Sequence, residues 1–271
     1  MNTDEKLACI PRSLNTSWFN LNCTLPYELK PEHIQHAMQD FIDFLGFINQ
    51  QLNTKEMPRL ESFLMPANFS SMVGEYMNIS IPKYCPTLAK NQYHNGHPDL
   101  IPVGVFANNA VQHSTEGIEI KGSRHLSGWQ GHNAESIWLM VFVFDSNTSN
   151  DTAKNIAPKP FSFQAVYAAK LTKRDWAFSG RSATSRRTIT ASVTQGGVQK
   201  MKANWVYEDL GKWQFQLCIL YGNRRKFLDR LFAHLVVFIH PLNANGWISN
   251  SIRGGNRRAW THEWIQDNPL T

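Results

Sequence analysis

A nearly uninterrupted apolar run over residues 137–144, IWLMVFVF, constrains the fold of this chain more than any other feature. A strand with one face in water alternates apolar and polar side chains, whereas this run presents no polar side chain to either face. The run is also far shorter than the roughly 20 apolar residues that cross a membrane as a helix. We therefore expect a central strand buried on both faces, in a sheet that further layers cover on each side.

The segments around this run predict an α/β fold. Over residues 31–53, apolar side chains recur every three or four positions after Pro31, as in an amphipathic helix that begins at a proline. A second helical pattern spans residues 69–78, and residues 161–171 form a further strand candidate. A chain of 271 residues with 42% hydrophobic content can bury a substantial core. The prediction is a single domain, 1–271, built on a mixed central β-sheet flanked by helices.

Glu119, Ile120 and Lys121 lie in another strand pattern. They alternate charged and apolar side chains between two glycines, which is typical of a strand. Successive side chains of a strand point to opposite faces, so Glu119 and Lys121 share a face while Ile120 packs behind them. An apolar segment at residues 100–106 and turn residues at 107–110 precede this strand. Together they predict a hairpin with Asp99 at its mouth.

The pairing of an acidic residue and a lysine two positions later has little weight by itself, because it also occurs at residues 4–6 and 28–30. Neither of those segments has a strand pattern around it. Only the third match follows a Pro-Asp pair and a predicted hairpin. The alternative interpretation is a surface Glu/Lys pair on an edge strand, with Asp99 capping a turn.

Two carboxylates and an ammonium at one point are suited to phosphodiester hydrolysis. The reaction needs neutralisation of charge in the transition state and a hydroxide near neutral pH, and a hard divalent cation supplies both. Mg²⁺ prefers oxygen ligands and keeps several waters, so Asp99, Glu119 and the Ile120 carbonyl are sufficient protein ligands. Lys121 would orient or help to deprotonate the attacking water. The catalytic candidates are thus Asp99, Glu119 and Lys121.

The segment from about residue 75 to residue 145, with Pro98-Asp99 followed by Glu119-Ile120-Lys121, resembles the PD-(D/E)xK nuclease superfamily, and type II restriction endonucleases most of all. The resemblance implies a restriction-endonuclease-like core and a homodimer that hydrolyses double-stranded DNA with Mg²⁺. It also implies Glu75 as a further metal ligand, and Arg124 and Gln130 as phosphate or water contacts. The chain would then divide into a helical part (1–80), a catalytic core (about 81–171) and a basic DNA-contacting part (about 172–271).

The charge distribution favours an anionic partner. The net charge is +6, and residues 170–202 contain eight basic residues and one acidic residue, with aromatic residues between them. A solvated basic face is the ordinary alternative. A DNA-binding module without catalysis would use the same segment. The predicted DNA contacts in this segment are Lys173, Arg174, Arg181, Arg186, Arg187, Lys200 and Lys202.

Histidines near the motif raise a less favoured hypothesis, a zinc-dependent hydrolase. His94 and His97 have the spacing of two ligands, but no third ligand follows at a diagnostic spacing. Next to Pro98-Asp99, His97 is also placed to tune a metal site through the ligands. The further candidates around the site are Cys85, His113, His125 and His132.

The cysteines and the hydropathy indicate a cytoplasmic protein without a membrane segment. Four cysteines are scattered along the chain with no Cys-x-x-Cys pair, so we expect reduced thiols. The N-terminal residues have no apolar signal core, and no run of about 20 apolar residues occurs. A last amphipathic pattern at residues 226–239 predicts a helix that packs on the core or on a second subunit.

Overall fold

The computed structural model describes residues 3–131, 134–151, 154–179 and 190–211. These residues form a mixed α/β fold around a six-stranded sheet with the strand order β1-β2-β3-β5-β6-β9. Neighbouring strands are antiparallel except β3 and β5, which are parallel, so the sheet is mixed as the sequence predicts. The strands are β1 (Leu88–Lys90), β2 (Leu100–Pro102), β3 (Ile118–Ser123), β5 (Trp138–Asp145), β6 (Ser162–Lys170) and β9 (Trp205–Glu208).

The apolar run at residues 137–144 becomes β5, the strand between β3 and β6. Met140, Phe142 and Phe144 belong to the core cluster on the helical side of the sheet. The alternate residues Leu139, Val141 and Val143 belong to a second cluster on the opposite side. All six are at most 1% exposed, and burial of each such side chain contributes about 1.5–3 kcal/mol. The prediction of a strand buried on both faces is therefore confirmed.

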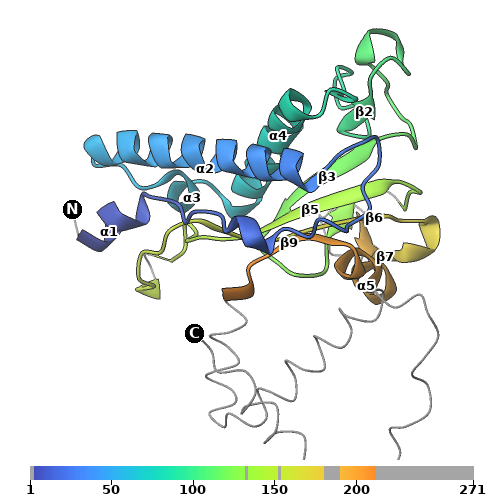
Figure 1. The fold of residues 1–271 in the computed structure, drawn as a ribbon. Helices are drawn as coiled ribbons and strands as arrows, with labels where there is room; N and C mark the ends of the chain where they lie inside the picture. The colour runs from blue at the N-terminus through green and yellow to red at the C-terminus, as the bar shows by residue number, and fades with distance from the viewer. Residues whose placement is uncertain (1–2, 132–133, 152–153, 180–189, 212–271) are drawn as a thin grey trace, which may run out of the picture. The chain divides into compact units, whose positions relative to one another are not determined.

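Helices cover one face of the sheet (Figure 1). The predicted helix at residues 31–53 is α2 (Pro31–Thr54), and the second helical pattern is longer than predicted, forming α4 (Pro66–Tyr84). Both begin at a proline, which needs no amide partner in the first helical turn. Two short helices accompany them, α1 (Thr3–Ala8) and α3 (Leu60–Phe63), together with a 3-10 turn η1 (Thr16–Trp18).

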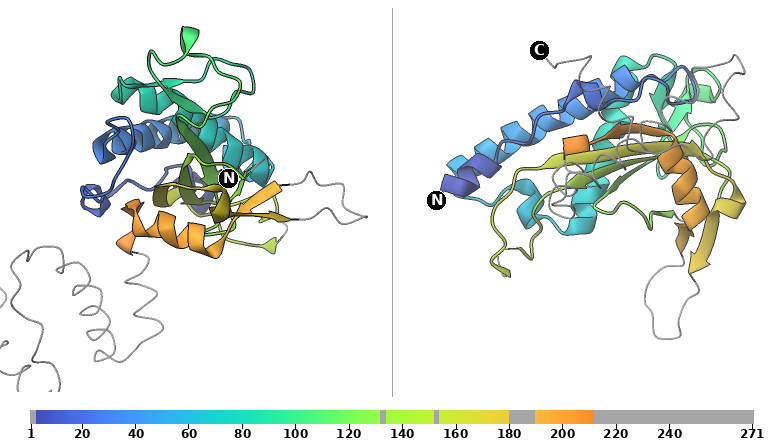
Figure 2. Two further views of the ribbon diagram at one scale, coloured as in Figure 1. Left: turned by 90° about the vertical axis from the view of Figure 1, so that its right-hand side faces the viewer. Right: turned by 60° about the horizontal axis from the view of Figure 1, so that its bottom comes forward.

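A small sheet and one helix cover the other face (Figure 2). The small sheet has the order β4-β8-β7, formed by β4 (Gln130–Gly131), β8 (Thr190–Val193) and β7 (Trp176–Ser179). The helix is α5 (Gln195–Ala203), capped by the Thr194 side chain, and the turn η4 (Lys173–Asp175) leads into β7. The described parts of the basic segment at residues 170–202 therefore contribute to the layer that buries β5, and they also expose cations.

The predicted hairpin exists, but its first strand is shorter than the sequence suggests. β2 pairs with β3 in antiparallel orientation through Leu100 and Ile118. β2 ends at Pro102, which has no amide to donate, and Gly104 then adopts a left-handed φ of 78°. The predicted turn contains the 3-10 turn η2 (Ala107–Asn109). The two other acidic-x-Lys matches lie in α1 and just before α2, outside any strand.

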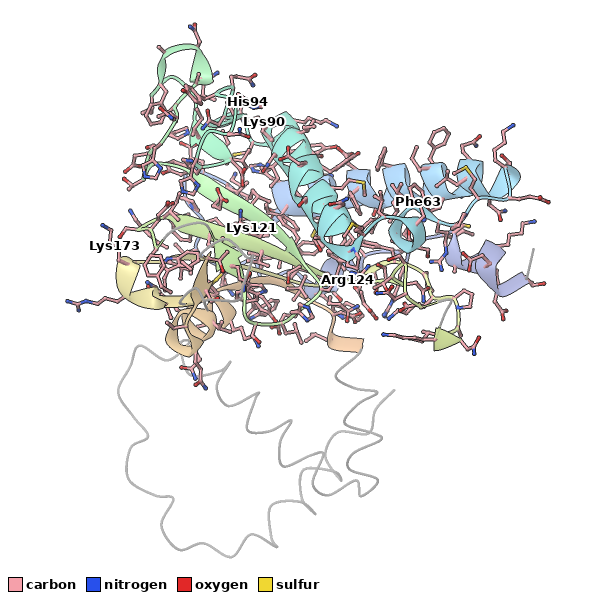
Figure 3. The ribbon with its side chains drawn as sticks, turned by 180° about the vertical axis from the view of Figure 1, so that it is seen from behind. Phe63, Lys90, His94, Lys121, Arg124 and Lys173 are labelled. Carbon is pink, nitrogen blue, oxygen red and sulfur yellow. The ribbon has the colours of Figure 1, made fainter. Side chains whose placement is uncertain are left out.

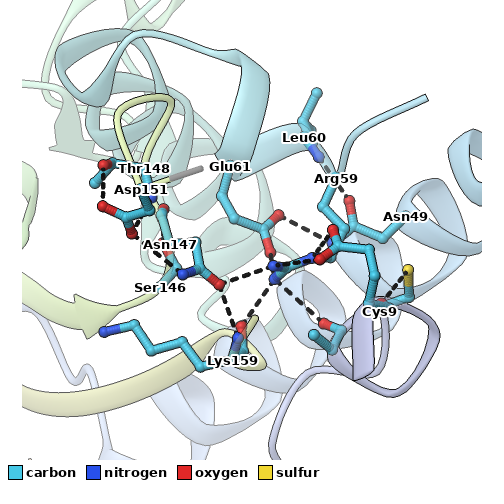
Figure 4. Close-up of polar contacts among 12 residues, drawn as sticks. Cys9, Asn49, Arg59, Leu60, Glu61, Ser146, Asn147, Thr148, Asp151 and Lys159 are labelled. Carbon is cyan, nitrogen blue, oxygen red and sulfur yellow. Dashed lines mark hydrogen bonds and ion pairs between the residues drawn. The ribbon is translucent and has the colours of Figure 1, made fainter. Parts of the chain in front are cut away.

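A buried arginine joins the N-terminal helix to the loop that follows β5 (Figure 4). Arg59 is 2% exposed and donates to Glu5 and Glu61 at 2.8 Å each. It also donates to the Asn147 side chain and to the Lys159 carbonyl at 2.8 Å each. A buried guanidinium is tolerated only when its donors are satisfied, and here carboxylate and amide oxygens satisfy them. This network ties α1, α3 and the loop into one unit.

Some predictions lie outside the described residues. These are the contacts assigned to Arg181, Arg186 and Arg187, the zinc candidate His132, the helix at residues 226–239, and the extension of the single domain over residues 212–271. Within the described ranges, no helix has the length and apolar character that crossing a membrane requires. In the same ranges, Cys9, Cys23 and Cys85 are free thiols.

Candidate active site

The strand β3 separates its apolar and charged side chains as the alternation predicts. Ile118 and Ile120 pack in the cluster beneath α2 and α4. Glu119 and Lys121 consequently point to the opposite face, where the small sheet lies. Among the residues that the structure describes, β3 has no ladder partner on the β2 side beyond Ile118, because β2 pairs with it only at that residue. An open strand edge with a charged pair beside it is therefore present at residues 119–121.

Asp99 closes this open edge. Its Oδ2 accepts a hydrogen bond from the Ile120 amide at 2.8 Å, which takes the place of a strand partner. The carbonyl and amide of one strand residue face the same side, so the Ile120 carbonyl also faces away from β5. The predicted ligand set of Asp99, Glu119 and the Ile120 carbonyl is thereby brought to one edge of β3.

The two carboxylates and the ammonium are electrostatically coupled. Burial raises the pKa of Asp99 well above its usual range, and the neighbouring charge of Glu119 raises it further. Burial also acts to raise the pKa of Glu119, but the hydrogen bond from His97 and the charge of Lys121 outweigh it and hold that pKa well below its usual range. Burial acts to lower the pKa of Lys121, yet the charges of Glu119 and Asp99 outweigh it and raise the pKa. Lys121 is therefore an ammonium in contact with Glu119.

A pocket of about 330 Å³ opens beside Glu119 and Lys121, whereas Asp99 is not among the residues that line it. Glu119 and Lys121 line it from β3, and Trp176 lines it from β7. Since β3 belongs to the six-stranded sheet and β7 to the small sheet, the pocket lies between these two sheets. Its full lining is Asn95, His97, Gln112, His113, Glu119, Lys121, Gly131, Glu135, Ile137 and Trp176.

His97 contacts the site more directly than the sequence indicated. Its Nδ1 lies 2.9 Å from Glu119 Oε2, and its Nε2 is in ion-pair contact with Glu135 Oε2, although that contact lacks hydrogen-bond alignment. Burial acts to lower the pKa of His97, but the hydrogen bond with Glu119 and the charges of Glu119, Glu135 and Asp99 outweigh it and raise the pKa. Glu135 precedes β5 in a segment without a motif, so its proximity to the site could not be read from the sequence.

Glu75 and Arg124 are not among the residues that line the pocket. Glu75 is 62% exposed on α4 and forms an ion pair with Lys90 at 3.2 Å, and it does not line the pocket. Arg124 donates three hydrogen bonds of 2.7 Å to the backbone and side chain of residues 146–147 and lies over the rings of Phe69 and Phe144. Its guanidinium holds the segment after β3 against the end of β5. The structure thus gives Arg124 a clear packing role.

The other predicted DNA contacts that fall within the described residues lie on the small sheet and on the elements next to it. Gln130 is exposed on β4, and Lys173 and Arg174 are exposed on η4. Lys200 pairs with Asp175 at 3.4 Å, and Lys202 lies over the Tyr167 ring at 6.0 Å from its centroid. Figure 3 labels Lys121 on β3, with Lys173 and Arg124 on either side of it in that view. The described cations of this segment are therefore exposed on the layer that also carries the pocket residue Trp176.

The donor set suits a hard cation that keeps part of its water. Two carboxylates lie side by side in a partly buried place. Burial, and after it the charge of Glu119, raises the pKa of Asp99, and a divalent cation would offset both effects. Across the ranges that the structure describes, no group of three or more His, Cys, Asp or Glu side chains is arranged to hold a metal ion. The zinc hypothesis gains no ligand set from these residues, whereas Mg²⁺ requires only the two carboxylates and a carbonyl.

Comparison of the chain with protein-family models, with curated proteins and with solved structures finds no match. The functional inference therefore depends on the geometry and chemistry of this site.

Proposed function

We propose that the protein is a Mg²⁺-dependent endonuclease that hydrolyses phosphodiester bonds of double-stranded DNA, with a restriction-endonuclease-like core. The observation that carries the proposal is the convergence of Asp99, Glu119 and Lys121 at one edge of β3, where Glu119 and Lys121 line a pocket. Two carboxylates and one ammonium, next to a strand carbonyl that can serve as a further ligand, are groups suited to metal-assisted phosphodiester hydrolysis.

In this proposal, Asp99, Glu119 and the Ile120 carbonyl hold the cation. When bound, Mg²⁺ supplies charge neutralisation at the phosphate and a water of lowered pKa. Asp99 is held in place because its Oδ2 accepts a hydrogen bond of 2.8 Å from the Ile120 amide. The Ile120 side chain is 3% exposed in the core, which fixes the peptide group that carries the carbonyl.

Lys121 acts as a positive charge rather than as a base. The carboxylates raise its pKa despite its partial burial, so it keeps its proton near neutral pH. Its ammonium contacts Glu119 and lines the pocket, where a scissile phosphate would bring negative charge. We propose that it orients the attacking water and neutralises the phosphate.

The exposed cations support a nucleic-acid partner. Lys173 and Arg174 lie on η4, directly before the strand that carries the pocket residue Trp176. A duplex bound across this face would place its phosphates near both the cations and the pocket. We propose a homodimer as the active form, because two related sites cut both strands of a duplex. Removing Lys173 or Arg174 is expected to reduce the slope of log affinity against log salt by about one each.

The test is incubation of the protein with supercoiled plasmid and with linear duplex DNA, with and without Mg²⁺. Wild-type protein should give cleavage products only with Mg²⁺. Asp99→Ala and Lys121→Ala should each reduce the rate by at least about 100-fold, since each removes a group that acts in the transition state. Asp43→Asn on α2 and Lys55→Ala at the C-cap of α2 remove single charges away from β3, and both variants should cleave as the wild type does.

Two other results would refute the proposal. DNA retardation without cleavage, unchanged by Asp99→Ala, would identify a non-catalytic DNA-binding module. Activity that is lost to a zinc-selective chelator and restored by zinc, but not by Mg²⁺, would identify a zinc hydrolase.

A further inference from the structure

One imidazole links two carboxylates at the wall of the pocket. His97 Nδ1 lies 2.9 Å from Glu119 Oε2, and His97 Nε2 is in ion-pair contact with Glu135 Oε2. The other oxygen of Glu119, Oε1, is in contact with the Lys121 ammonium. Each oxygen of the Glu119 carboxylate therefore has a different cationic or donor partner. Glu135, His97 and Glu119 form a continuous chain of contacts from the segment before β5 to β3.

The backbone around His97 is held on both sides. Its amide donates to the Gln112 carbonyl at 3.0 Å, and its carbonyl accepts from the Ser114 amide at 2.9 Å. The ring stacks on His113, with 5.4 Å between centroids. The buried Asn91 donates to the carbonyl of the next residue, Pro98, at 3.0 Å. The imidazole is thus presented to Glu119 from a braced segment.

Glu135 is held by the small sheet. Its backbone carbonyl accepts a hydrogen bond from Trp176 Nε1 at 2.9 Å. Trp176 is 9% exposed and packs in the cluster between the two sheets. Glu135 is 15% exposed and His97 is 24% exposed, so both lie at the wall of the pocket rather than on the open surface. The position of Glu135 is therefore linked to the packing of β7.

We propose that His97 and Glu135 are positioning residues, which fix the Glu119 carboxylate so that it can serve as a cation ligand at the edge of β3. The proposal rests on the proposed function, because it assumes that Glu119 binds a divalent cation. A glutamate side chain has several rotatable bonds, and ordering it at binding costs conformational entropy. A donor that orients the carboxylate beforehand removes part of that cost, and loss of such outer partners weakens metal binding by about 10- to 100-fold.

The experiment measures Mn²⁺ binding by electron paramagnetic resonance, with Mn²⁺ as a stand-in for Mg²⁺. His97→Ala and Glu135→Ala should each weaken Mn²⁺ binding by about 10- to 100-fold. Glu135→Gln keeps an oxygen that can accept a hydrogen bond from His97, so this variant should bind Mn²⁺ more tightly than Glu135→Ala. His97→Gln keeps one donor for Glu119 and should likewise lie between His97→Ala and the wild type.

A matched control separates positioning from general destabilisation. His36 also stacks on an aromatic ring, that of Tyr84 at 5.0 Å, but it lies on α2 and contacts no pocket residue in the contacts that the structure describes. His36→Ala should bind Mn²⁺ as the wild type does. Thermal unfolding of each variant reports whether it is folded, and the Gln variants keep the test valid if an Ala variant does not fold.

The outcomes separate this proposal from the proposed function. If the wild type cleaves DNA and folded His97→Ala and Glu135→Ala bind Mn²⁺ as tightly as it does, the positioning roles are refuted and the endonuclease stands. If the wild type binds Mn²⁺ but does not cleave DNA, the endonuclease is refuted while the affinities of the variants still decide the positioning roles. If the wild type binds no Mn²⁺, both proposals are refuted.

Discussion

The contact between α4 and β3 predicts that Gly122→Ala destabilises the protein. A Cβ at Gly122 would lie 2.3 Å from the Ser70 carbonyl oxygen and 3.0 Å from Val73 Cβ, both on α4. The nearest obstacle is helix backbone, which cannot rotate away as the tip of a side chain can. α4 would have to move away from β3, and overpacking of this kind costs about 1–3 kcal/mol. We expect the upper half of that range, because Ser70 and Val73 belong to a regular helix.

Urea unfolding followed by far-ultraviolet circular dichroism measures this loss as a lower transition midpoint at unchanged slope. Gly196→Ala on α5 is the matched control. The nearest atom to a Cβ there is Thr194 Oγ1 at 3.9 Å, so the same methyl group meets no obstacle. That control should leave stability unchanged or raise it by about 0.4–1 kcal/mol.

The same substitution also tests the link between packing and the site. Gly122 follows Lys121 directly, so a displaced α4 would shift the strand that carries Glu119 and Lys121. Folded Gly122→Ala should therefore bind Mn²⁺ more weakly than the wild type. A Gly122→Ala protein as stable as the wild type, within about 0.5 kcal/mol, would refute the reasoning from close approach.

Three further predictions concern stability. Arg59→Met should cost about 3–5 kcal/mol in urea unfolding, because it leaves the Glu61 carboxylate buried without its cation; adding Glu61→Leu should restore much of the loss. Phe142→Ala should lower the free energy of unfolding by about 3–5 kcal/mol, because it opens a cavity in the core. A much smaller loss would mean that neighbouring side chains fill the cavity. Asp40 is partly buried, which acts to raise its pKa, but hydrogen bonds from Ser80 and its neighbours on α4 outweigh this and lower it. Its contribution to stability is thus present above the unfolded pKa of about 3.9 and lost as the pH falls through the folded pKa. Asp40→Asn should lose less stability than the wild type on acidification from pH 6 to pH 3, and equal losses would contradict this assignment.

Local periodicity determined the main elements. The apolar run of β5, the three-and-four spacing of α2 and the alternation at residues 118–121 each depend on neighbours in the chain, so they can be read from the sequence. The same local rules predicted that Glu119 and Lys121 share a face and that Asp99 lies at the hairpin mouth. Their convergence follows from the pairing of β2 with β3, because Asp99 directly precedes Leu100, which pairs with Ile118.

Only the tertiary structure decided what lies around these residues. Glu135 is brought to His97 because β5 is parallel to β3, which places the segment before β5 beside the start of β3. Arg124 packs on Phe69 and Phe144, and the exposed Glu75 pairs with Lys90, because elements distant in sequence meet there. A side chain's partners depend on which distant segments share its layer, and no local pattern encodes that choice. The sequence alone thus determined the strand, the helix and the charged pair, while the fold selected the groups that surround the pair.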